Sequence, residues 1–197
     1  MLTKTQAKIM ETFVSKISDN FSIKQISELL KKPYPLIHRE IKKLVNERFI
    51  IRDKRKLLSL NYKENSLDLA YIEHLRTKEF VKKIKALQLF INDVFKIEKD
   101  FFILLIFGSA IEKNNPRDID ILFIIEDKKK INETEKVLEN IASNLSLNFD
   151  ISVISVESVY EMLSKRDSPN IMNETLNKHI IVFGAENFYK ILKNARQ

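Results

Sequence analysis

The sequence predicts an α+β protein with an N-terminal helical domain, a helical joint, and a C-terminal α/β domain built on a small mixed sheet. Three observations predict this organisation. Residues 1–65 show helical apolar spacing and hold 15 Lys and Arg against 7 Asp and Glu, a net charge of +8. Residues 66–98 carry a long apolar stripe. Residues 99–197 alternate short apolar runs with helical segments, as α/β domains do.

The composition is that of a soluble globular chain. Its 197 residues are 44% hydrophobic and 31% charged, enough for one large or two small domains with a buried core. The absence of Cys excludes a disulfide scaffold, a thiol nucleophile and a cysteine metal site. No apolar run reaches the length of a membrane span, and charges interrupt the first residues. We therefore expect a cytoplasmic protein without a signal peptide.

Three helices are predicted in the first third, over residues 3–17, 23–30 and 35–47. The first has apolar residues at i, i+4 and i+8, which form one face. Ser22 can cap the second helix, and Pro35 suits the first turn of the third.

A hairpin with a basic tip follows, because apolar runs at 49–52 and 56–60 flank Asp53-Lys54-Arg55. Three helices and a basic hairpin resemble the winged helix-turn-helix domain of small prokaryotic transcription regulators, over residues 3–62. The resemblance implies a third helix in the major groove of double-stranded DNA and a hairpin on the flanking backbone. The residues expected to contact DNA are Tyr34, Pro35, His38, Arg39, Lys42, Lys43, Arg52, Lys54, Arg55 and Lys56.

Two other interpretations of this basic domain stay open. A single Lys or Arg most often only solvates a helix face. The concentration of the whole set on one helix and one hairpin tip favours DNA over that interpretation. Winged helices also bind proteins, and a protein-docking role is the second alternative.

The joint at residues 66–98 is predicted to be helical, with Ser66 as its cap. Its apolar pattern is interrupted around residues 77–79, so one long helix and two shorter helices are both compatible with it. The stripe suits packing between domains. It would also suit pairing with its copy in a homodimer.

Two strands are predicted at residues 101–107 and 119–125, joined through Gly108-Ser109. Asp118 and Asp120 stand at i and i+2 and so share one face of the second strand. An edge strand with both acids in water is one interpretation. The apolar residues around the acids occupy both faces of the strand, which disfavours it. Buried like charges disfavour each other's ionisation, and divalent metal ions would resolve the conflict.

A third strand is predicted at 147–153, with Asp150 in its middle. An acid inside an apolar strand needs a partner. The backbone N–H groups of the Gly-Ser turn could hold phosphate. Three strand carboxylates and this turn together predict a two-metal phosphoryl-transfer site.

Gly108-Ser109, Asp118-Ile119-Asp120 and Asp150 resemble the signature of the DNA polymerase beta-type nucleotidyltransferase superfamily, above all its minimal prokaryotic members. The resemblance covers residues 100–193, including the segment 179–192. The eight residues between Ser109 and Asp118 are fewer than is common in the family, and Arg117 stands where a small residue is usual.

The resemblance implies a C-terminal nucleotidyltransferase-like domain that binds Mg²⁺ and a nucleoside triphosphate, most often ATP. Asp118 and Asp120 would ligate the metals. Asp150 would hold the second metal and help to deprotonate the acceptor hydroxyl. Gly108 and Ser109 would hold the phosphates.

Two functions are therefore predicted from the sequence. In the first, the protein transfers a nucleoside monophosphate to a hydroxyl acceptor. In the second, it is a DNA-binding transcription regulator, or an antitoxin-like partner of a helical toxin, whose C-terminal domain senses a nucleotide or docks a protein without turnover. The three His, at 38, 74 and 179, lack metal-ligand spacing and are interpreted as surface or packing residues rather than zinc ligands.

Overall fold

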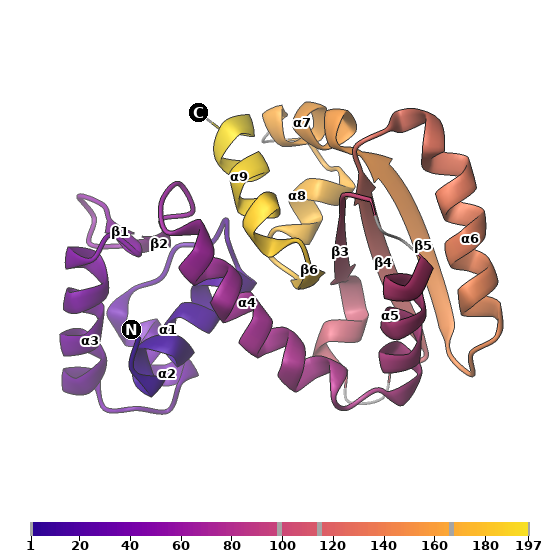
Figure 1. The fold of residues 1–197 in the computed structure, drawn as a ribbon. Coiled ribbons are helices and arrows are strands. Elements are labelled where there is room, and N and C mark those ends of the chain that lie inside the picture. Colours follow the sequence, from indigo (N-terminus) through magenta and orange to yellow (C-terminus); the bar gives the residue numbers. More distant parts are fainter. Residues whose placement is uncertain (1, 98–99, 114–115, 166–167, 197) are drawn as a thin grey trace.

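The computed structural model describes residues 2–97, 100–113, 116–165 and 168–196. The fold is α+β, with a small antiparallel sheet and a four-stranded mixed sheet, as the sequence predicts. Figure 1 shows the helical N-terminal unit beside the larger unit that contains the four-stranded sheet, with α4 running between them. We call residues 2–62 the N-terminal unit. We call the four-stranded sheet, with the helices that cover it, the sheet unit.

The N-terminal unit contains the predicted three helices and hairpin. Two capping boxes start its first helices: Thr3 with Gln6, and Ser22 with Gln25. Pro35 lies in the first turn of the third helix, where its missing N–H leaves no helical bond unmade. The elements are α1 (Lys4–Ser15), α2 (Ile23–Leu29), α3 (Tyr34–Asn46), β1 (Ile50–Arg52) and β2 (Leu58–Leu60).

The joint consists of two helices, α4 (Ser66–Val81) and α5 (Lys85–Ile97). They separate at residues 82–84, so the interruption predicted at 77–79 lies inside α4. The predicted Ser66 cap is wrong. Ser66 is the first helical residue, and Asn65 precedes it in a left-handed backbone conformation without a side-chain cap bond. The predicted domain boundary between 98 and 99 lies outside the described residues.

The four-stranded sheet has the order β5-β4-β3-β6. Strands β4 and β5 pair in parallel, and the other pairs are antiparallel. The strands are β3 (Phe102–Phe107), β4 (Asp118–Ile125), β5 (Asn148–Ser155) and β6 (His179–Phe183). The connections are η1 (Gly108–Glu112), η2 (Lys128–Lys130), α6 (Ile131–Ser143), α7 (Val156–Ser164) and α8 (Ile171–Thr175), and α9 (Ala185–Ala195) follows β6.

Two apolar clusters fill the faces of this sheet. One contains α5 and α6 side chains, such as Phe90 and Leu138, against one face. The other contains α7 and α9 side chains against the opposite face, and it continues through α4 into the core of the N-terminal unit, where Phe13 is fully buried. The N-terminal unit and the sheet unit therefore share one continuous core. Within the described residues, no helix has the length and apolar character needed to cross a membrane.

Candidate functional site

The three predicted acids lie at one end of the sheet. In the parallel register of β4 and β5, Asp120 is opposite Asp150, and Asp118 is opposite Asn148. Asp118 and Asp120 are two residues apart on β4, so all three acids belong to the same sheet face. We call Asp118, Asp120 and Asp150 the acid trio.

The acids are less buried than the sequence indicates. Asp118 and Asp150 are exposed and Asp120 is half-buried. The prediction that apolar strands enclose all three acids is wrong for Asp118 and Asp150. The physical reason is their position: each acid lies among the first three residues of its strand, where the end of the sheet meets solvent. The edge-strand interpretation is also wrong for β4, which lies between β5 and β3.

The Gly-Ser turn lies directly against this trio. Phe107, the last residue of β3, pairs with Asp120, and Gly108 follows with a φ of +74°. A Cβ atom on Gly108 would overlap Asp120 Oδ2, so a larger residue here would displace the carboxylate. Ser109 lies in the short 3₁₀ helix η1, and its Oγ accepts a hydrogen bond of 3.1 Å from Lys113 Nζ.

The electrostatics of the trio favour a cation. Partial burial raises the pKa of Asp120, and the neighbouring Asp150 and Asp118 carboxylates raise it further, while Lys113 acts in the opposite direction. Asn148 Nδ2 donates to Asp118 Oδ1 over 3.2 Å. Carboxylates that face each other across two strands repel, and a bound cation would remove that repulsion.

The trio suits Mg²⁺ in the kind of ligand, because carboxylate oxygens are the donors that this ion prefers. In the part of the chain that the structure describes, no three His, Cys, Asp or Glu residues form a group that could hold a metal ion. The parallel register of β4 and β5 places Asp120 and Asp150 side by side.

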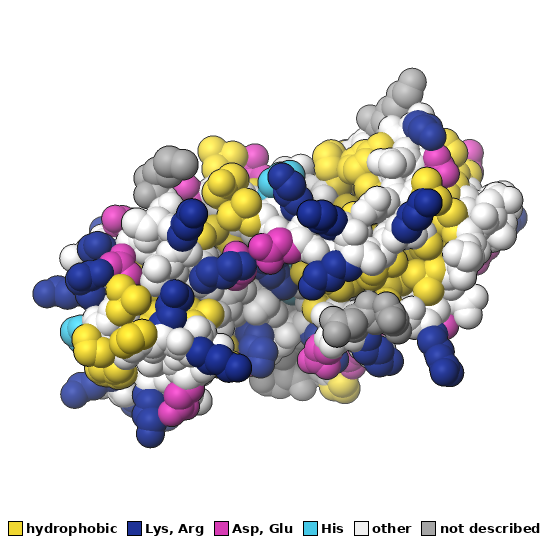
Figure 2. Space-filling view, turned by 90° about the horizontal axis from the view of Figure 1, so that it is seen from below, with side chains coloured by type: hydrophobic (Ala, Val, Ile, Leu, Met, Phe, Trp, Pro, Cys, Tyr) yellow, Lys and Arg dark blue, Asp and Glu magenta, His cyan; other side chains and the backbone are white. Residues whose placement is uncertain are grey.

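All ten residues predicted to contact DNA are exposed, on α3 and around the β1–β2 hairpin. Tyr34 stacks on His38 with ring centroids 6.0 Å apart. His38 and Lys42 line a surface groove of about 350 Å³ that extends to Arg52 on β1. Figure 2 shows Lys and Arg side chains over the N-terminal unit and across the middle of the same face of the molecule.

Sequence reasoning missed Glu40, a buried acid on α3. Its carboxylate accepts hydrogen bonds from Arg39 Nε at 3.1 Å and from Lys43 Nζ at 3.3 Å. Burial alone would raise the pKa of Glu40, but Arg39 and Lys43 outweigh it and hold the pKa below its ordinary value. Two of the ten predicted DNA contacts therefore share an internal counter-ion.

Sequence reasoning also missed a buried polar cluster between α4, α9 and β6. We call Glu73, Arg76, His179 and Tyr189 the Glu73 network. The Glu73 and His179 side chains are fully buried, so the interpretation of His179 as a surface or packing residue omits its polar role. A signal was present: Glu73 is four residues after Leu69 and follows Ile72, which places an acid on the apolar face of a helix.

Comparison with known proteins adds nothing to this geometry: no protein-family model, no curated protein and no solved structure matches the chain.

Proposed function

We propose that the protein is a nucleotidyltransferase-like enzyme whose N-terminal unit is a DNA-binding winged helix. It would transfer a nucleoside monophosphate from an ATP–Mg²⁺ complex to a hydroxyl acceptor. The observation that carries the proposal is the arrangement at the end of the sheet. Three carboxylates lie on one face of adjacent strands, and a glycine that must lack a side chain brings a Gly-Ser turn against the central one.

Each residue of this site has a role that its position supports. Asp118 and Asp120 would hold Mg²⁺, which neutralises phosphate charge when bound. Lys113, held at Ser109, adds a positive charge beside the turn that would receive the phosphates.

Asp150 would take the proton of the acceptor hydroxyl, because it is exposed and faces Asp120 across the strands. The acceptor oxygen then forms a bond to the α-phosphorus. The bond from that phosphorus to the bridging oxygen breaks, and pyrophosphate leaves with the electron pair.

DNA binding by the N-terminal unit is supported by the exposure of α3 and the hairpin and by their shared groove. An α-helix that presents Arg39, Lys42 and Lys43 suits a major groove lined by phosphates. Glu40 orders two of these side chains on the helix surface, which reduces the entropy lost when they bind.

A test of the chemistry uses α-labelled ATP, Mg²⁺ and RNA or protein acceptors. We expect label on an acceptor with the wild type and at least a hundredfold less with Asp150→Asn. Glu139→Gln, an exposed change on α6, should transfer label as the wild type does. Equal transfer by the Asp150 variant would remove Asp150 from the mechanism.

One observation favours a second function, in which the sheet unit senses a nucleotide or docks a protein without turnover. Asp118 and Asp150 are exposed, and the described residues include no group of three His, Cys, Asp or Glu that could hold a metal ion. A transcription regulator or an antitoxin-like partner of a helical toxin would need to bind the nucleotide but not to catalyse its transfer. ATP binding without label transfer to any acceptor would support this second function.

A further inference from the structure

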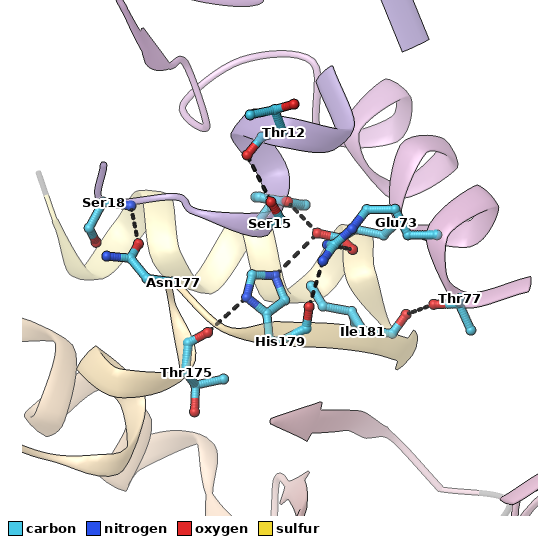
Figure 3. A network of polar contacts seen from close by, with 11 residues as sticks. Thr12, Ser15, Ser18, Glu73, Thr77, Thr175, Asn177, His179 and Ile181 are labelled. Carbon is cyan, nitrogen blue, oxygen red and sulfur yellow. Dashed lines mark hydrogen bonds and ion pairs between the residues drawn. The ribbon is translucent and has the colours of Figure 1, made fainter. Parts of the chain in front are cut away.

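The Glu73 network joins α4 to the first residue of β6 (Figure 3). Arg76 Nη1 donates to Glu73 Oε2 over 2.6 Å, and Tyr189 OH donates to Glu73 Oε1 over 2.9 Å. His179 Nδ1 lies 2.8 Å from Thr175 O, which can only accept, so Nδ1 carries a proton. His179 Nε2 lies 3.2 Å from Glu73 Oε1. One buried carboxylate is thus held by three side chains.

The same helix also satisfies the outer edge of β6. Arg76 Nη2 donates to the carbonyl oxygen of His179 over 2.7 Å, and Thr77 Oγ1 donates to that of Ile181 over 2.7 Å. Strand β6 is at the end of the sheet order, where such carbonyls lack a strand partner. Side chains of α4 therefore fix both the position and the register of β6 against the helix.

Strand β6 in turn holds the Gly-Ser turn from two sides. His179 pairs with Phe107, the residue immediately before Gly108. Lys178 Nζ contacts Glu112 Oε2, at the other end of η1, over 2.9 Å. The turn thus lies between two attachments, one to His179, the first residue of β6, and one to Lys178, the residue directly before that strand.

The N-terminal unit contacts the same segment. Ile17 N donates to Leu176 O over 3.0 Å, and Ser18 N donates to Asn177 Oδ1 over 2.8 Å. Asn177 Nδ2 donates to Asp19 Oδ1 over 2.9 Å. The loop between α1 and α2 thus contacts the residues directly before β6.

Apolar residues could hold α4 on β6 with equal or greater stability, because buried ions must first lose their hydration. A polar network differs in that it accepts a single arrangement, since any slip leaves a buried donor or acceptor unpaired. That property suits a segment whose exact position matters to a neighbouring site.

We propose that the residues of the Glu73 network are positioning residues for the Gly-Ser turn. They fix β6, and β6 fixes Gly108 and Ser109 against Asp120. The inference rests on the proposed function for what the turn binds. The coupling of the network to the turn is a property of the chain that is measurable without any ligand.

The test is amide hydrogen exchange in the full-length protein, read at residues 106–112, with Tyr189→Phe. This change removes one hydroxyl and leaves Glu73 paired with Arg76 and His179. We expect exchange in that segment to become roughly tenfold faster, the size of one lost hydrogen bond to a charged group. Thr77→Val, which removes the bond to Ile181 O, is a second variant with the same expected direction.

Val159→Ala in α7 is the control, because Val159 is buried in the same apolar cluster as Tyr189. Faster exchange at 106–112 in the Tyr189 and Thr77 variants but not in the control supports the proposal. Unchanged exchange there, or an equal increase in the control, overturns it. Absence of ATP binding by the wild type would instead contradict the proposed function and leave the exchange result valid.

Discussion

The Glu73 network and the acid trio are two clusters of charge on one sheet, and they differ in how their charges are balanced. In the network, burial alone would raise the pKa of Glu73. The Arg76 guanidinium, together with the contact to His179 Nε2 and the hydrogen bond from Tyr189, more than compensates and holds this pKa below its ordinary value. In the trio, burial and neighbouring acids raise the pKa of Asp120. In the first cluster, the charge of Glu73 is balanced by other residues of the chain. In the second, like charges lie side by side, and a bound cation would balance them.

The comparison distinguishes charges that are balanced within the fold from charges that are not. Buried charges persist in a folded core only when each has a partner, as Glu73 has. Acids that face each other at the open end of a sheet oppose folding slightly, and such an arrangement is typical of ligand sites. The predictions below test the two clusters against this distinction, in order of decreasing effect.

The largest effect is expected from breaking the network. Glu73→Ala leaves Arg76 and Tyr189 without their buried acceptor, and we expect a loss of about 3–5 kcal/mol in the free energy of unfolding, measured by urea denaturation. Glu79→Ala, on the same helix with a side chain 70% exposed, should change it by less than about 0.5 kcal/mol. A loss below about 1 kcal/mol for Glu73→Ala would contradict the structural role.

The sequence anticipated the trio better than the network, for a physical reason. Alternation along a strand and the Gly-Ser break are local signals, so β4, the turn and the face shared by Asp118 and Asp120 were predictable. The parallel register that brings Asp150 opposite Asp120 depends on pairing between segments thirty residues apart. The resemblance implied their proximity, whereas periodicity alone did not.

The network joins residues that are still farther apart, since Glu73 and His179 are separated by 106 positions. Its single local signal was an acid on the apolar face of a helix. The N-terminal helices were predictable to within a few residues because apolar spacing and the Ser22 cap are local signals, whereas Thr3, predicted inside the first helix, is its cap. Exposure of Asp118 and Asp150 was not predictable, since it depends on where the sheet ends.

The second prediction concerns the basic face of the N-terminal unit. Arg39→Ala, Lys42→Ala and Lys43→Ala combined should weaken binding of the full-length protein to duplex DNA by tenfold or more at low salt. The slope of log K against log salt should fall by about one for each lost phosphate contact. Lys136→Ala, on the exposed side of α6, is the control for the loss of one positive charge outside this face. Fluorescence anisotropy at several salt concentrations measures both quantities, and an unchanged slope would argue for a protein-docking face.

The third prediction is a pH dependence that belongs to the network. The depressed pKa of Glu73 means that its stabilisation is complete above the ordinary value of 4.5 and is lost as pH falls through the folded-state pKa. The stability difference between wild type and Glu73→Gln should therefore shrink as pH is lowered from 7 toward 3. Urea unfolding at a series of pH values measures it. A constant difference over that range would mean that the Glu73 charge is not what stabilises the cluster.

The smallest effect is expected in the trio and has the opposite sign. Because the pKa of Asp120 is raised, its ionisation at neutral pH opposes folding, and this penalty disappears below the ordinary value of 3.8. Asp120→Asn should therefore raise the free energy of unfolding by about 0.2–1 kcal/mol at pH 7 without metal, and by less near pH 3. Glu139→Gln is the control. A less stable Asp120 variant at pH 7 would indicate that the carboxylate is structural.

Calorimetric titration of the full-length protein with ATP and Mg²⁺, compared with Asp118→Asn combined with Asp120→Asn, tests the central claim most directly. We expect a one-site isotherm for the wild type and at least a hundredfold weaker binding for the double variant, which should fold at least as well because clustered charge has been removed. Equal binding by the two proteins, or no binding by the wild type, would contradict the assignment of this end of the sheet as a nucleotide site.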